Sequence, residues 1–177
     1  YTDINHVDFN PSHQITSHTD HLAFGSYFQA GRYSTGHELI TWTGATASDA
    51  TQKYGDTAGR IASTSTDNQF RTITNSPYHW MSTIDLTTWV GVSAVNNPCP
   101  EGFRIPTLED YNAEADTWVT KDINGSLGSV LKFSFSGFRY RTSGSAYFSI
   151  GSDTYVATSD YGSEDWFAIN FSINSIS

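Results

Sequence analysis

The stretch NPCPEGFRIPTLEDY, residues 97–111, decides how the middle of this 177-residue chain folds. It contains three of the five prolines of the chain and its single cysteine. Pro98 and Pro100 prevent regular strand pairing on either side of Cys99, and Pro106 fixes the backbone before the next segment. We therefore predict a rigid, irregular segment here, in which Cys99 is a small buried apolar residue.

Residues 107–119 carry the signals of a helix that begins as this segment ends. Thr107 is a suitable N-cap, and Asp110 stands at the third helical position, where its carboxylate favours the helix start. Apolar residues then follow at helical spacing on one face: Leu108, Tyr111, Ala115, Trp118 and Val119. We predict one amphipathic helix over 107–119.

Beyond this helix the apolar pattern changes to a period of two. Residues 131–136 (LKFSFS) alternate, and residues 166–173 (WFAINFSI) place Phe167, Ile169, Phe171 and Ile173 on one face. Two further short strands, 145–151 and 154–160, lie between them and are separated by glycines. The C-terminal half is predicted to be a helix followed by an antiparallel β-meander.

The N-terminal half is less regular. A short strand near Ile4 is followed by a polar loop, and residues 23–33 (AFGSYFQAGRY) have the pattern of a buried turn and strand. Residues 43–78 show no sustained period, whereas residues 83–92 (TIDLTTWVGV) resemble a strand. Since there is no tandem repeat and no clear linker, we predict a single domain over 1–177, with the first ~20 residues as an arm or linker from a longer protein.

Composition excludes several classes of function. The chain has 18 acidic and 9 basic residues and a net charge of −9, which argues against nucleic acid or an anionic membrane as the main partner. No apolar run reaches the ~20 residues that a membrane-spanning helix needs. One cysteine excludes an internal disulfide. Charged residues make up only 15%, and abundant Ser, Thr, Gly and Tyr are typical of secreted or surface β-rich proteins.

Three stretches carry a family resemblance. The first is CPEGFRIPT within the opening stretch, the second is GSYFQAGR (25–32), and the third is GFRYRTSGSAYFSIGSDTYVATSD (137–160). Together they resemble the Fibrobacter succinogenes major paralogous domain family of bacterial surface proteins, with Ala30 and Val156 where that family usually has aromatic residues. The resemblance covers roughly residues 22–173. It implies a C-type-lectin-like α+β fold: small twisted antiparallel sheets, one or two helices and long irregular loops.

Metal-binding and catalytic chemistry receive little support. His6, His13, His18 and His21 match no zinc spacing, and the acidic loop residues Asp153, Asp160, Glu164 and Asp165 lack the calcium-binding triplets of sugar-binding C-type lectins. The formylglycine-generating enzymes, which share the fold implied by the resemblance, work through two cysteines, whereas this chain has one. We expect no catalytic residues, no metal and no cofactor, and an enzyme of that type is the least favoured alternative.

The C-terminal loops have the composition of a binding surface. Aromatic residues recur there among Ser, Gly and Asp, as they do in loops that bind by contact area. The candidate ligand-binding residues are Tyr140, Arg141, Tyr147, Tyr155, Tyr161, Asp165 and Trp166. The alternative is that these aromatic residues only cover the sheet beneath the loops.

The function predicted from these features is extracellular, non-catalytic recognition of a cell-surface glycan or protein, at the tip of a bacterial adhesin or in a phage receptor-binding head. We expect the protein at the cell surface or on a virion, with no nucleic-acid partner and no membrane insertion, and with oligomers only as part of a larger assembly. A second interpretation is a filament or pilus subunit that assembles by strand addition through its last strand.

Overall fold

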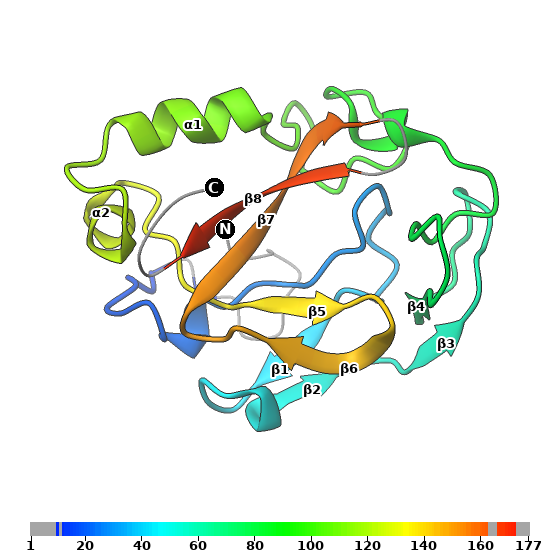
Figure 1. Ribbon diagram of the computed structural model, residues 1–177, viewed down its shortest axis with the longest axis horizontal. Helices are drawn as coiled ribbons and strands as arrows, with labels where there is room; N and C mark the ends of the chain where they lie inside the picture. The colour runs from blue at the N-terminus through cyan, green and yellow to red at the C-terminus, as the bar shows by residue number, and fades with distance from the viewer. Residues whose placement is uncertain (1–9, 11, 163–165, 173–177) are drawn as a thin grey trace.

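The computed structural model of the chain describes residue 10, residues 12–162 and residues 166–172. In these ranges the protein is an α+β structure with few helices and several small sheets (Figure 1). The helices are α1 (Leu108–Asp116), α2 (Ile123–Gly128) and the 3-10 helices η1 (His21–Ala23), η2 (Ala47–Asp49) and η3 (Leu86–Trp89). The strands are β1 (Ile40–Trp42), β2 (Ala50–Gln52), β3 (Asp56–Ala58), β4 (Phe70–Thr72), β5 (Phe138–Tyr140), β6 (Ser143–Phe148), β7 (Asp153–Tyr161) and β8 (Trp166–Ser172).

Helix α1 begins where the sequence predicts it. Thr107 Oγ1 accepts a hydrogen bond from the Asp110 N–H (3.1 Å), and the Asp110 carboxylate accepts one from the Thr107 N–H (2.7 Å), which completes a capping box. The helix ends at Asp116, three residues earlier than predicted. Helical spacing is lost beyond that point, so the inclusion of Val119 in the apolar stripe is wrong: its side chain is 99% exposed.

The proline-rich segment before α1 forms neither helix nor strand, as predicted. Asn97 holds it in shape, because its Oδ1 accepts from the Cys99 N–H (3.1 Å) and its Nδ2 donates to the carbonyls of Val92 (3.1 Å) and Phe103 (2.7 Å). Cys99 is only half-buried, and the prediction that it is buried is therefore wrong.

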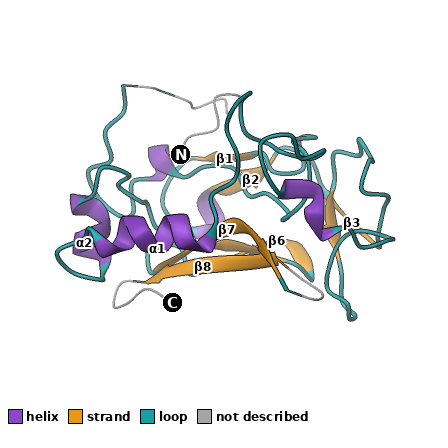
Figure 2. Ribbon diagram, turned by 90° about the horizontal axis from the view of Figure 1, so that it is seen from above, coloured by secondary structure: helices purple, strands orange, loops and turns teal. Residues whose placement is uncertain are grey.

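Strands β7 and β8 form an antiparallel pair, and α1 lies along one face of it (Figure 2). Ile169 and Phe171 of β8 point toward α1 and are buried, as the two-residue period predicts. With residues of α1 and its flanks they form one core cluster: Tyr111, Ala115, Trp118, Phe135, Ile169 and Phe171. Full burial of an aliphatic or aromatic side chain of this size contributes roughly 1.5–3 kcal/mol, so this cluster anchors the helix to the sheet. Phe167 and Ile173, placed on the same face by the sequence, have side chains outside the described part of the structure.

The predicted strand at 131–136 is not a strand. Lys132 has a positive φ of 48°, which interrupts the extended backbone, and Leu131 is exposed. Phe135 is nevertheless fully buried, and its N–H donates to the His18 carbonyl (2.7 Å). The alternating pattern therefore identifies Phe135 as a core residue and Phe133 as one partly buried against the same cluster, but it is wrong about Leu131 and about the backbone conformation.

Strands β5 and β6 form a second antiparallel hairpin beside β7. The predicted strands at 145–151 and 154–160 correspond to β6 and β7, whereas no strand was predicted at β5. The two hairpins join where Gly137 forms a bridge to Thr154 and donates its N–H to the Asp153 carbonyl (2.8 Å). Gly137 has a φ of +75°, and a Cβ atom there would lie 2.1 Å from the Phe148 carbonyl oxygen. Glycine is thus required at this joint.

The N-terminal half differs more from the sequence-based prediction. Residues 23–33 are partly buried, through Phe24 and Tyr27, but they form no strand. Residues 83–92 contain the 3-10 helix η3 in place of a strand, because the Asp85 carboxylate caps it by accepting from the Thr87 N–H (3.0 Å). The irregular region 43–78 contains β2, β3 and β4, and the β3–β4 pair is parallel, so the expectation of antiparallel sheets alone is wrong.

The N-terminal half has its own core cluster, which consists of Phe24, Tyr27, Ile40, Trp42 and Tyr147. Tyr147 comes from β6, so this cluster connects the N-terminal half to the C-terminal hairpins. The described part of the first 22 residues contacts the domain as well, through the His18 carbonyl. The predicted strand near Ile4 lies outside the described residues. None of the helices in the described ranges has the length and apolar character needed to cross a bilayer.

Candidate functional site

The structure places the predicted ligand-binding residues in different parts of the C-terminal hairpins. Tyr140, Arg141 and Tyr155 lie together at β5, the β5–β6 turn and β7, because Tyr140 and Tyr155 each contact a ring of the same aromatic pair, Phe138 and Phe148. Tyr161 is exposed at the far end of β7 and pairs with Trp166 in the strand register. Asp165 and the side chain of Trp166 lie outside the described part of the structure.

Tyr147 points to the opposite side. Its ring is buried, with only 9% exposed, and packs 5.8 Å from the Tyr27 ring and 5.9 Å from the Trp42 ring. Burial raises the pKa of its hydroxyl. Tyr147 is therefore a core residue, and this position supports the alternative that some of these aromatic residues pack beneath the loops.

Four rings on β5, β6 and β7 contact one another in a continuous surface, which we call the aromatic patch: Phe138, Tyr140, Phe148 and Tyr155. Phe138 and Tyr140 are partly buried, and Phe148 and Tyr155 are exposed. Phe138 and Phe148 stack at 5.7 Å, Tyr140 meets Phe148 edge-on at 5.4 Å, and Tyr155 meets Phe138 edge-on at 4.9 Å. Phe148 and Tyr155 each remain 46% exposed. Edge-to-face and offset-stacked rings at these distances stabilise one another, so the patch is held in a fixed arrangement.

The strand register explains why the patch faces away from the core. Phe138 is opposite Phe148 on the β5–β6 hairpin, and the next pair, Arg139 and Tyr147, is buried. On β7 the same alternation buries Thr154 and exposes Tyr155. Asn170 on β8 lies opposite Tyr155, and its Nδ2 donates to the Tyr155 hydroxyl (3.3 Å). Two hairpins thus present their outward rings to one surface.

Arg141 extends the aromatic patch at the tip of the β5–β6 hairpin. Its guanidinium lies 4.1 Å from the ring centre of Tyr78 and 5.6 Å from that of Tyr140. Its backbone is fixed, because its carbonyl accepts from the N–H of the buried Ile73 (2.8 Å). Tyr78 is itself 44% exposed and comes from the loop after β4.

A buried ionic cluster lies on the inner side of the same hairpin. Arg139 donates to the His37 carbonyl (2.7 Å), and His37 Nδ1 lies 3.0 Å from the Glu38 carboxylate. The Gln29 N–H donates to His37 Nε2 (3.2 Å), so this nitrogen is an acceptor and the neutral ring carries its proton on Nδ1. Burial, together with the charges of Arg32 and Arg139, lowers the pKa of His37 to about 4.

Glu38 is ionised within this cluster. Burial acts to raise the pKa of its carboxyl group, but hydrogen bonds from His37, Ser34 and the Gly36 N–H outweigh it and lower the pKa to about 2. Because His37 and Glu38 are both almost completely buried, the cluster has no access to a substrate in solvent. It joins the 29–39 segment to β5 and so positions the hairpin that carries the aromatic patch.

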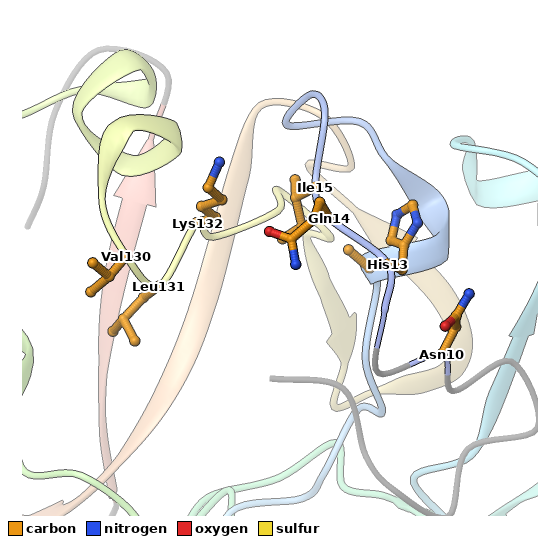
Figure 3. Close-up of a pocket in the computed structure, with 8 residues that line it drawn as sticks. Asn10, His13, Gln14, Ile15, Val130, Leu131 and Lys132 are labelled. Atoms are coloured by element: carbon orange, nitrogen blue, oxygen red, sulfur yellow. The ribbon is translucent and has the colours of Figure 1, made fainter.

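Two hollows in the described part of the surface lie away from the aromatic patch. One, of about 190 Å³, lies between the N-terminal segment and residues 130–132, with Val130 and Leu131 on one side and His13, Gln14 and Ile15 on the other (Figure 3). His13, one of the four clustered histidines, is already bound there to the Asp20 carboxylate (2.9 Å). A second hollow of about 240 Å³ is lined mainly by Ser and Thr of residues 63–66. Among the described residues, no three His, Cys, Asp or Glu side chains are placed to bind a metal ion.

Sequence reasoning missed three residues of this surface. Within each strand the patch residue alternates with a buried neighbour: Phe138 and Tyr140 flank Arg139 on β5, and Phe148 follows Tyr147 on β6. The two-residue period within β5 and β6 was therefore a usable signal for Phe138 and Phe148. Tyr78 had no such signal, because it comes from an irregular loop that only the tertiary fold brings to Arg141.

Comparisons of the chain with protein-family models, characterised proteins and solved structures give no match.

Proposed function

We propose that this chain is a non-catalytic recognition domain of C-type-lectin-like fold, and that the aromatic patch with Arg141 and Tyr78 is its binding surface. The observation that carries the proposal is the patch itself, a set of mutually packed rings whose outer members, Phe148 and Tyr155, stay 46% exposed. Contiguous exposed apolar patches are typical of interaction sites, whereas apolar side chains exposed singly are common on any surface.

The physical properties of the patch suit binding. Aromatic side chains present a large contact area and lose little conformational entropy, since only two torsions are fixed on binding. Here the rings already fix one another, and the buried cluster of Arg139, His37 and Glu38 holds the hairpin beneath them. A ligand therefore meets a preorganised surface, which lowers the entropic cost of association.

The resemblance in residues 97–111, 25–32 and 137–160 supports a role in a bacterial surface protein or a phage receptor-binding protein of the same fold. The low charge and the abundance of Ser, Thr, Gly and Tyr support an extracellular location. The helix followed by paired antiparallel strands and the long irregular loops of the N-terminal half accord with the fold that the resemblance implies.

The test is a binding screen on immobilised purified glycans and bacterial surface proteins. It compares the wild-type chain with a Phe148→Ser/Tyr155→Ser double variant and with Phe103→Ser as a matched control. Phe103 is also an exposed aromatic residue, with 66% exposure, but it lies in the segment before α1. Size-exclusion chromatography and circular dichroism establish that each variant is folded.

We expect the wild-type chain and the control variant to bind a common ligand, and the folded double variant to lose that binding at least tenfold. Equal binding by all three proteins would refute the assignment of the surface. If the wild-type chain binds nothing and elutes as long assemblies that the double variant does not form, the filament-subunit function replaces recognition.

A further inference from the structure

Arg141 differs from the other described arginines because its guanidinium has neither a carboxylate partner nor a hydrogen-bond acceptor among the described residues. The others are engaged by carboxylates or carbonyl oxygens: Arg32 and Arg71 with Asp67, Arg104 with Asp110, Arg60 with the carbonyls of Asn75 and His79, and Arg139 with the carbonyl of His37. Within the described ranges, no carboxylate forms an ion pair with Arg141 and no atom accepts a hydrogen bond from its guanidinium. This is notable in a chain with twice as many acidic as basic residues.

The guanidinium belongs to an exposed residue and is held by aromatic rings. Its contacts are with the ring of Tyr78 at 4.1 Å and that of Tyr140 at 5.6 Å, which hold it in place while its N–H groups remain unused by described residues. A guanidinium held in this way binds a carboxylate through two parallel N–H···O bonds, a geometry that lysine cannot reproduce. An anion bound at Arg141 would lie beside the aromatic patch, because Tyr140 contacts both.

The size of the patch indicates what kind of molecule carries this anion. From the exposed fractions of Phe148, Tyr155 and Tyr78, the aromatic surface offers on the order of 300 Å². A stable protein partner covers roughly 800 Å² on each side. The smaller area corresponds to a few sugar rings, whose apolar C–H faces stack on aromatic rings, with an anionic substituent within reach of Arg141.

We propose that the ligand of this surface is an acidic saccharide, with its carboxylate bound by Arg141 and its adjoining rings stacked on Phe148 and Tyr155. The proposal rests on the recognition function proposed above and specifies its ligand class. The overall charge of −9 repels anions at long range, but this repulsion is screened beyond ~8 Å at physiological salt. Local contacts therefore decide the binding.

The experiment measures the affinity of the full chain for oligogalacturonate and for the same oligosaccharide after reduction of its carboxylates to alcohols. Both are measured at physiological ionic strength by calorimetry or biolayer interferometry. The proteins are the wild type, Arg141→Gln, Arg141→Lys and Lys121→Gln. Lys121 is an exposed cation on the segment after α1, paired with Asp116, and serves as the charge-matched control.

We expect oligogalacturonate to bind the wild type roughly 10- to 100-fold more tightly than the reduced oligosaccharide, as the loss of a charge-assisted hydrogen-bonded pair implies. Arg141→Gln is expected to lose this preference for the charged oligosaccharide, Arg141→Lys to keep only part of it, and Lys121→Gln to keep it in full.

Three outcomes would overturn the proposal, and they bear differently on the function. If both oligosaccharides bind equally and the Phe148→Ser/Tyr155→Ser variant loses both, the surface recognises neutral sugar and the recognition function stands without the acidic ligand. If neither oligosaccharide binds while the wild-type chain captures a protein in the panel through the same patch, the acidic-saccharide ligand is refuted. Loss of all binding in the panel refutes the recognition function itself.

Discussion

Acidification should destabilise this protein through His37. The ring is buried, its Nε2 accepts a hydrogen bond from the Gln29 N–H, and the cations Arg32 and Arg139 are close, so its pKa falls from the ordinary 6.5 to about 4. In the unfolded chain the same ring takes up a proton near pH 6.5. Below pH 6.5 the His37 ring is therefore protonated in the unfolded state but stays neutral in the folded state until the pH approaches about 4.

The magnitude follows from the linkage between proton binding and folding. Above pH 6.5 the ring is neutral in both states and contributes no pH dependence. As the pH falls from 7 to 5, only the unfolded state is protonated, and the free energy of unfolding decreases by about 2 kcal/mol. Glu38, whose pKa lies at about 2 in the folded state, adds its own loss only below its ordinary value of 4.5. The window between pH 7 and 5 therefore reports His37.

The assay is urea unfolding, followed by tryptophan fluorescence, at half-unit steps between pH 7.5 and 5. The wild-type chain is compared with His37→Gln, which is uncharged throughout this range and keeps a side-chain amide near Glu38. We expect the variant to be less stable at pH 7 and its stability to vary less between pH 7 and 5, by about 2 kcal/mol. An equally steep decline in both proteins would refute the role assigned to His37.

Three further perturbations test other parts of the structure. Gly137→Ala should reduce the free energy of unfolding by more than ~2 kcal/mol, because the added Cβ meets the Phe148 carbonyl oxygen and the backbone has a positive φ; a near-neutral value in chemical denaturation would contradict the geometry of the joint. Thr107→Ala should lower the free energy of unfolding by about 1 kcal/mol, because it removes the N-cap of α1, whereas Thr107→Ser should keep most of the wild-type stability. Equal losses for both variants in thermal unfolding would show that the cap is not the cause. Phe148→Ser should change stability by less than ~1 kcal/mol yet weaken binding in the panel at least tenfold, and the reverse pattern would identify Phe148 as a structural residue.

Local signals allowed the C-terminal half to be predicted well. The cap at Thr107, the apolar spacing to Trp118 and the alternation in 166–172 act over a few residues, so the sequence reports them directly. The strand at 131–136 was predicted wrongly because an alternating apolar pattern does not require an extended backbone. Residues 131–136 alternate like a strand, but the positive φ of Lys132 and the hydrogen bond from the Phe135 N–H to the His18 carbonyl accompany an irregular path. Along it Phe135 is buried, Phe133 is partly buried and Leu131 is exposed.

The N-terminal half depends on contacts that no local pattern encodes. Residues 83–92 have strand-like composition, yet Asp85 caps a 3-10 helix and places Trp89 in the core. The parallel β3–β4 pair joins two short segments of an irregular region, and the buried cluster of Gln29, His37, Glu38 and Arg139 joins segments 102 residues apart, from His37 to Arg139. Sequence periodicity has no means of detecting such pairs.

The candidate site was predicted in part for the same reason. Tyr140, Arg141 and Tyr155 were identified by composition, and composition also selected Tyr147, whose strand parity places it in the core. Tyr78 joins the surface only because the loop after β4 folds against the β5–β6 hairpin.

The central claim is that the aromatic patch contacts the ligand directly. The most direct measurement is a titration of the 13C-labelled chain with the tightest-binding molecule from the panel, followed through the aromatic ring resonances by NMR. We predict that the resonances of Phe138, Tyr140, Phe148 and Tyr155 shift on binding, while those of Tyr111 and Trp118, on the opposite side of the sheet, do not. Shifts confined to rings outside the patch, with those four unchanged at saturation, would contradict the account.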